Sequence, residues 1–133
     1  MITRDDLFLE KARESLAGAD SEFAQGHYDN CANRCYYACF QAAIWALDRA
    51  GIRPRGASGE WSHAFVPAQF DGQLIGRRKV YSPELRTVLA RNYALRERAD
   101  YEPGPVSQTE TSRALRRARS FVQAMASNGE RTR

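Results

Sequence analysis

The stretch NRCYYACFQAAIWALDRAG (residues 33–51) carries many of the side chains in this chain that could do chemistry. Arg34, Tyr37 and Gln41 follow one another at spacings of three and four, which places them on one face of a helix. A guanidinium binds phosphate oxygens well through its planar fork of donors. Because an isolated buried charge is very costly, Arg34 requires either an ionic partner or an open site.

A second polar segment, LRERADY (residues 95–101), follows later in the chain. Its Arg96 and Asp100 are four positions apart and can pair on a helix surface. In one interpretation, Arg34 and Asp100 form an ion pair between two helices, and the protein is a purely structural subunit. In the other, Arg34, Arg96 and Tyr101 line a phosphate-binding groove, where Asp100 orients the arginines. Removing Arg34 or Asp100 would unfold the domain only in the first case.

The three cysteines, Cys31, Cys35 and Cys39, are spaced four apart and share one helical stripe. An odd number in one local cluster, with no distant partner, argues against disulfides and against zinc. We therefore expect small buried core residues, no metal and no cofactor. The two histidines, His27 and His63, are interpreted as surface or helix-capping residues.

Composition and charge indicate one globular domain. The chain has 133 residues, 43% of them hydrophobic, and no apolar run long enough to cross a membrane. Its start lacks a signal-peptide core, so a cytoplasmic location is predicted. Residues 1–30 carry three basic and seven acidic groups (net −4), and residues 31–133 carry seventeen and nine (net +8). This asymmetry fits either a solvated basic surface or a face for a polyanion such as RNA.

The hydrophobic pattern predicts an all-α fold, an antiparallel bundle of four to five helices. Thr3 and Ser82 are expected N-caps, and Gly51 is the expected C-terminal stop of the central helix. The domain should span residues 1–126, with a disordered tail at 127–133. Helices are predicted over residues 5–25, 29–50, 62–74, 83–100 and 108–126, with a basic loop at 76–82.

Two motifs together resemble those of the HEPN domain family, in particular its small stand-alone bacterial and archaeal members. The first is the Asn-Arg-x-Tyr-Tyr-Ala-x-Phe helix, and the second is a later Arg-x-x-Ala-Asp-Tyr. The matching residues are Asn33, Arg34, Tyr36, Tyr37, Ala38 and Phe40, then Arg96, Ala99, Asp100 and Tyr101. The resemblance covers nearly the whole chain and implies a helical bundle that forms a homodimer.

The resemblance also implies functions. Many HEPN proteins pair with a minimal nucleotidyltransferase in toxin–antitoxin-like modules, and others are metal-independent ribonucleases. The ribonucleases carry an arginine, then four to six residues, then a histidine, and no arginine stands at that distance before His27 or His63. At the matching place this chain has Asp100, which is ionised near neutral pH and is a poor proton shuttle.

The sequence therefore predicts a nucleotide-binding, RNA-binding or regulatory subunit that works with a nucleotidyltransferase. The alternative is a noncanonical ribonuclease whose catalytic residues are Arg96, Asp100 and Tyr101. The predicted ligand-binding residues are Asn33, Arg34, Tyr37, Arg96, Asp100 and Tyr101.

Overall fold

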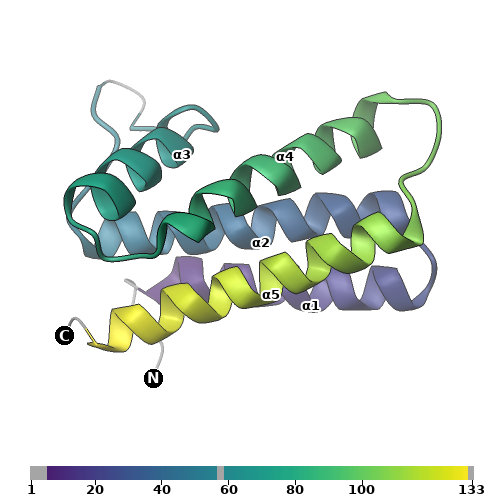
Figure 1. The fold of residues 1–133 in the computed structure, drawn as a ribbon, viewed down its shortest axis with the longest axis horizontal. Helices are drawn as coiled ribbons and strands as arrows, with labels where there is room; N and C mark the ends of the chain where they lie inside the picture. The colour runs from purple at the N-terminus through teal and green to yellow at the C-terminus, as the bar shows by residue number, and fades with distance from the viewer. Residues whose placement is uncertain (1–5, 57–58, 132–133) are drawn as a thin grey trace.

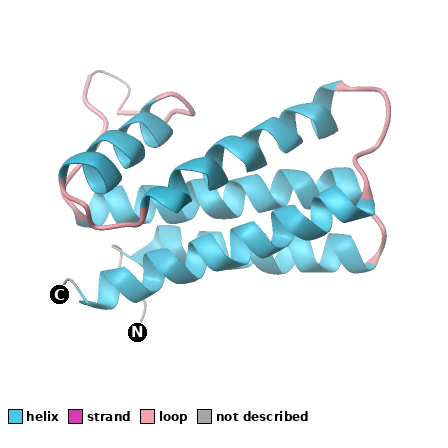
Figure 2. Ribbon diagram, viewed as in Figure 1, coloured by secondary structure: helices cyan, strands magenta, loops and turns pink. Residues whose placement is uncertain are grey.

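The computed structural model describes residues 6–56 and 59–131, and in this part of the chain all regular structure is helical (Figure 2). Consecutive long helices run antiparallel, so the prediction of an all-α antiparallel bundle is confirmed (Figure 1). The predicted cap Thr3 lies outside the described residues. The elements are α1 (Leu7–Ala24), α2 (Tyr28–Arg49), α3 (Phe65–Gln69), η2 (Phe70–Arg77), η3 (Pro83–Leu85), α4 (Arg86–Tyr101) and α5 (Gln108–Arg131).

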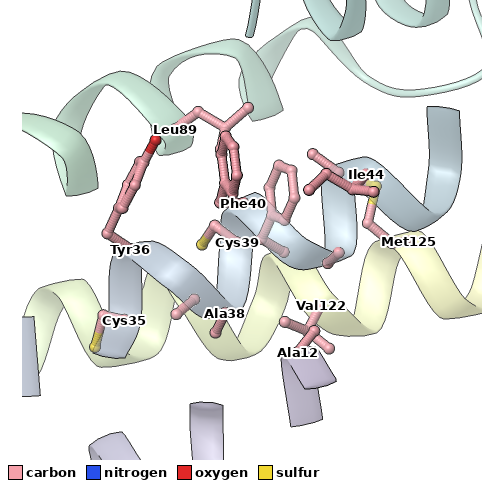
Figure 3. Packing of buried hydrophobic residues seen from close by; sticks show 14 of the residues in the cluster. Ala12, Cys35, Tyr36, Ala38, Cys39, Phe40, Ile44, Leu89, Val122 and Met125 are labelled. Carbon is pink, nitrogen blue, oxygen red and sulfur yellow. The ribbon is translucent and has the colours of Figure 1, made fainter. Parts of the chain in front are cut away.

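Helix α2 is the centre of the bundle, and α1, α5, α4 and α3 all contact it. Small residues, alanine and cysteine, occupy much of its surface and let the neighbouring helices approach closely. Side chains of α1, α4 and α5 lie around α2 in Figure 3, where Ala12, Leu89, Val122 and Met125 are labelled. The predicted apolar stripe is buried throughout, as are the three cysteines: Tyr36, Phe40, Ile44, Leu47, Cys31, Cys35 and Cys39.

The C-terminus of α2 ends where the sequence predicts. Gly51 adopts φ +80°, a left-handed conformation that costs glycine little. The backbone N–H of Gly51 donates to the Asp48 carbonyl at 3.0 Å, and that of Ile52 donates to the Leu47 carbonyl at 2.9 Å. These two bonds form a Schellman motif, which satisfies carbonyls that the helix leaves unpaired.

The segment after α2 is helical for longer than expected. Ser62 Oγ accepts the Phe65 N–H at 2.9 Å and so begins α3, where Pro67 is tolerated in the first turn. The chain then widens into the π-helical η2, which ends at Arg77 rather than at residue 74. Leu74 and Ile75 are buried and anchor η2 to the core. The first two residues of the predicted basic loop, Gly76 and Arg77, are therefore helical.

Both remaining long helices begin at serine caps. Ser82 Oγ accepts the Glu84 N–H at 3.4 Å, as predicted, and the 3₁₀ turn η3 leads into α4. At α5, Ser107 Oγ accepts the Glu110 N–H at 3.0 Å and Glu110 Oε1 accepts the Ser107 N–H at 3.3 Å. This reciprocal pair is a capping box.

Helix α5 continues to Arg131, so the predicted end at Ala126 and the start of the predicted tail are wrong. Ser127, Asn128 and Gly129 are poor helix formers, but tertiary contact overrides this weak preference. The Asn128 amide donates to the Val80 carbonyl at 2.9 Å and fixes the last turns. Residues 132–133 lie outside the described residues. The expected inward face is buried, namely Leu115, Ala118, Phe121, Val122 and Met125.

No helix among residues 6–56 and 59–131 is both long enough and apolar enough to span a bilayer.

One polar side chain sits in the core between α2, α4 and α5. Asn92 is 1% exposed, and its amide donates to Cys39 Sγ at 3.5 Å and to the Ala114 carbonyl at 3.4 Å. Its carbonyl oxygen accepts from Arg117 Nε at 3.0 Å. Asn92 therefore ties three helices together and keeps Arg117, half-buried beside it, hydrogen-bonded.

Asn92→Ala should lower the free energy of unfolding by about 2–3 kcal/mol, because it leaves buried polar groups without partners. Urea denaturation measures this. Arg116→Ala, on the exposed face of the neighbouring α5, should stay within about 0.5 kcal/mol of the parent protein. A loss below about 1 kcal/mol for Asn92→Ala would contradict a structural role for this network.

Candidate functional site

The guanidinium of Arg96 lies among tyrosine rings where α2 meets α4. Its central carbon is 5.6 Å from the ring centroid of Tyr36, 5.6 Å from that of Tyr37 and 5.9 Å from that of Tyr93. These distances are those of cation–π contacts. We call Arg96, the three tyrosines and the adjacent His63 the Arg96 cluster.

The fold explains why these rings meet. Tyr36 and Tyr37 are neighbours on α2, while Tyr93 and Arg96 are three residues apart on the facing side of α4. The Tyr36 side chain is buried and extends from α2 toward α4 (Figure 3). Its ring centroid lies 5.3 Å from that of Tyr37 and 5.3 Å from that of Tyr93. The cluster is thus fixed by ordinary core packing.

Arg96 also forms the predicted pair with Asp100. Arg96 Nε lies 3.1 Å from Asp100 Oδ2, and the Arg96 side chain is 15% exposed. The separation is that of an ion pair, but the Nε–H is buried and is not aligned for a hydrogen bond to any described residue. Partial burial opposes the charge on Arg96, yet Tyr37 and Asp100 outweigh it and raise its pKa. The guanidinium is therefore charged and under-bonded.

His63 joins this cluster from the loop that precedes α3. Tyr36 Oη and His63 Nδ1 are 2.6 Å apart, and the imidazole centroid lies 4.8 Å from that of Phe40. The rest of the ring is exposed, as expected of a surface residue, but Ser62 rather than His63 caps the helix. The partial burial of His63 and the positive charge of Arg96 lower the pKa of the imidazole. Burial raises the pKa of Tyr36.

Sequence reasoning did not place His63 in the site, because it precedes Arg96 by 33 positions and no local spacing connects them. His27, at the turn between α1 and α2, is a surface residue as predicted. Its Nδ1 lies 2.8 Å from Glu22 Oε2.

Asp100 and Tyr101 lie at the C-terminal end of α4, close to the cluster. The Tyr101 side chain is 74% exposed, which is unusual for a large hydrophobic residue in the described part of the chain. Its phenol contributes to the electrostatic environment of Arg96. The structure therefore brings Arg96, Asp100 and Tyr101 together, with the tyrosines of α2 beside them.

Arg34 lies elsewhere, and its predicted burial and pairing with Asp100 are wrong. The side chain is exposed and makes no ion pair or hydrogen bond with any described residue. It lies across α1 at Gly18, where a Cβ would stand 3.5 Å from Arg34 Nη1. The helical phase of α2 is the reason: Tyr36 faces α4, whereas Arg34 and Asn33 face α1.

These side chains line a polar groove between α1 and α2, which we call the α1–α2 groove. It has a volume of about 390 Å³ and is lined by Ser15, Glu22, Asn30, Asn33, Arg34, Tyr37 and Gln41. Ser15 Oγ and the Gln41 side-chain amide are 2.7 Å apart and hold its floor. Tyr37 contacts Arg96 on one side and lines the groove on the other. The predicted single cleft is therefore two neighbouring sites that share Tyr37.

The family model of the HEPN domain matches residues 6–128, nearly the whole chain. The chain belongs to the HEPN domain family. A comparison with curated proteins found no match. In this HEPN protein the histidine beside Arg96 is His63, which precedes Arg96 by 33 positions. The pair therefore does not follow the family's spacing of an arginine, four to six residues and a histidine. Among residues 6–56 and 59–131, no three histidine, cysteine, aspartate or glutamate side chains are grouped so that they could hold a metal ion.

We expect the pKa of His63, measured by NMR titration, to lie below that of a free histidine. Arg96→Gln should raise it, because the repelling charge is gone, while Arg116→Ala should leave it unchanged. His63 binds protons more readily in the unfolded chain. Its contribution to stability is therefore complete above the unfolded pKa and falls as the pH drops toward the folded pKa. A His63 pKa that Arg96→Gln does not move would contradict the electrostatic contact.

Proposed function

We propose that this HEPN protein binds RNA or a nucleotide through the Arg96 cluster. The observation that carries this proposal is the state of Arg96: a charged guanidinium, 15% exposed, fixed by three aromatic rings, with a buried Nε–H that lacks a hydrogen bond to any described residue. Arg96 Nε already lies 3.1 Å from Asp100 Oδ2, so a ligand anion would meet the rest of the charged guanidinium, which the three rings hold in place. Phosphate suits the planar fork of an arginine.

The rings around Arg96 support nucleic acid over inorganic phosphate. Tyr101, at the C-terminal end of α4, is 74% exposed and can stack on an unpaired base, and Tyr93, in the middle of α4, is 38% exposed. The net charge of +8 over residues 31–133 attracts a polyanion to this part of the chain. Asp100 offsets part of the charge of Arg96, which favours reversible binding. Single-stranded RNA is the ligand class that combines a phosphate, a stackable base and a flexible backbone.

Arg96→Ala should weaken binding of a labelled single-stranded RNA by at least about ten-fold, as expected for loss of a hydrogen bond to a charged group. Arg96→Lys should restore only part of the affinity, because lysine keeps the charge but lacks the fork. Fluorescence anisotropy at several NaCl concentrations measures both, and affinity should fall as salt rises.

Arg116→Ala is the matched control, since it removes an exposed arginine from α5 and should leave the affinity within about two-fold of the parent protein. Circular dichroism confirms that each variant is folded. Absence of RNA binding at low salt, or equal losses for Arg96→Ala and Arg116→Ala, would reject the proposal.

The partners remain part of this proposal and rest on the family resemblance. We propose that the protein is a homodimer and acts as the binding or regulatory subunit of a nucleotidyltransferase-associated, toxin–antitoxin-like module. A minimal nucleotidyltransferase encoded next to it would support that role. Arg34 is exposed, which argues against the alternative of a purely structural subunit in which Arg34 and Asp100 form an ion pair between helices.

A second candidate function is RNA cleavage, and the contact between His63 and Tyr36 favours it. If Nδ1–H of His63 donates to Tyr36 Oη, the exposed Nε2 is a free acceptor beside Arg96. There it can take the proton of a ribose 2′-OH while O2′ attacks phosphorus. The bond from phosphorus to the 5′-oxygen breaks, that oxygen takes a proton from water, and a 2′,3′-cyclic phosphate forms. Arg96 would stabilise the charge on the phosphate. Asp100 and Tyr101 would then position Arg96 and the RNA.

If this activity exists, RNA incubated with the protein in chelator is cut, and Arg96→Ala and His63→Gln each lower the rate by about 100-fold or more. Gel electrophoresis of an end-labelled RNA measures the rate, and Arg116→Ala should cut at the rate of the parent protein. Cleavage that persists in His63→Gln would point to a contaminating nuclease and exclude this mechanism.

A further inference from the structure

The geometry points to a second nucleotide subsite in the α1–α2 groove, where Arg34 binds the phosphate next to the one held by Arg96. The inference rests on the proposed RNA-binding function and deepens it, because it makes the preferred ligand a short single strand rather than one nucleotide. Tyr37 is the shared wall that connects the two subsites.

Arg34 is positioned for such a role without being used inside the protein. Its side chain lies against Gly18 on α1, where an added Cβ would make only ordinary contact with Arg34 Nη1, at 3.5 Å. In the described part of the chain, no carboxylate or carbonyl bonds it. Asp100, its predicted partner, is engaged with Arg96 instead. An arginine held against a glycine and left unpaired beside a polar groove is available to an anion.

The remaining walls suit a base and its sugar. Asn30 and Asn33 offer amide donors and acceptors, which read base edges in single-stranded RNA. Glu22 is the acidic lining residue, and its Oε2 is already engaged within the protein, 2.8 Å from His27 Nδ1 and 3.5 Å from Asn30 Nδ2. A groove of about 390 Å³ is within the size range of small-ligand sites.

The two arginines then act on neighbouring units of one strand. Arg34 and Tyr37 are three residues apart on α2, about 4.5 Å along the helix axis, and the Tyr37 ring that contacts Arg96 also lines the groove. A strand that places one phosphate at Arg96 therefore passes Tyr37 and continues along α1. A mononucleotide fills only one of the two subsites.

The test compares AMP with a tetra-adenylate by calorimetric titration at one salt concentration. The parent protein should bind the tetranucleotide at least about ten-fold more tightly than AMP, within the range expected for one more stacked and contacted base. Arg34→Ala should remove most of that ratio by weakening tetranucleotide binding. It should also reduce the salt slope for the tetranucleotide by about 0.7, the value for one phosphate of a single strand.

A second pair of variants leaves Arg34 in place. Gly18→Glu sets a carboxylate beside the guanidinium and should reproduce the loss seen in Arg34→Ala, whereas Gly18→Gln, of the same size but uncharged, should retain most of the ratio. Both replacements favour the helix over glycine, so folding is preserved. Arg116→Ala is the control for loss of one positive charge.

A tetranucleotide-to-AMP ratio that Arg34→Ala and Gly18→Glu leave within two-fold of the parent protein would overturn this subsite. If Arg34→Ala instead dissociates a dimer in light scattering and leaves the ratio unchanged, the groove is a contact between copies and the inference is wrong. Failure of the proposed function looks different: neither ligand binds, or Arg96→Ala changes neither affinity.

Discussion

The constraint on which this structure depends is the enclosure of α2. From Ala38 to Leu47 each side chain of this helix except Gln41 is buried, so this half carries mostly apolar or small residues. Any polar function of α2 must therefore lie nearer its N-terminus, where the packing is incomplete. Asn33, Arg34 and Tyr37 occur there, and they reach solvent on the side of α1 or α4.

Charge is handled in two ways in this bundle. In the core, Asn92 bonds to Arg117 and gives a half-buried guanidinium a neutral partner. Near the surface, Arg96 is surrounded by rings and one carboxylate, with its Nε–H unsatisfied among the described residues. The first arrangement is closed and stabilises the fold. The second is open, and this difference separates an arginine of the scaffold from one suited to a ligand.

Local signals predict much of this fold. The stripe of Tyr36, Phe40, Ile44 and Leu47 predicts the central helix, and Gly51 predicts where that helix ends. Ser82 predicts the start of the helical segment that leads into α4. These predictions succeed because caps and apolar periodicity act within a few residues. The Arg96–Asp100 pair follows from i, i+4 spacing alone. The confirmed family resemblance extends these local predictions to the whole bundle.

Tertiary contacts decide the rest, and no local pattern encodes them. His63 meets Tyr36 across a long loop, so its spacing in the sequence carries no information. Arg34 lies against Gly18 because Arg34 and Tyr36, two residues apart, point roughly 200° apart around α2, one toward α1 and the other toward α4. Asn128 extends α5 by bonding to Val80, although its own helix preference is weak.

The burial of the three cysteines determines when their thiols can react with oxidants. Cys31, Cys35 and Cys39 have no exposed surface, and burial is the main reason that the pKa of Cys39 rises to about 12. A sulfur that solvent cannot reach reacts slowly with peroxides and alkylating agents. Oxidative damage at these thiols is therefore confined to molecules whose α2 has come out of the bundle, and the rate of thiol labelling reports how often that opening occurs.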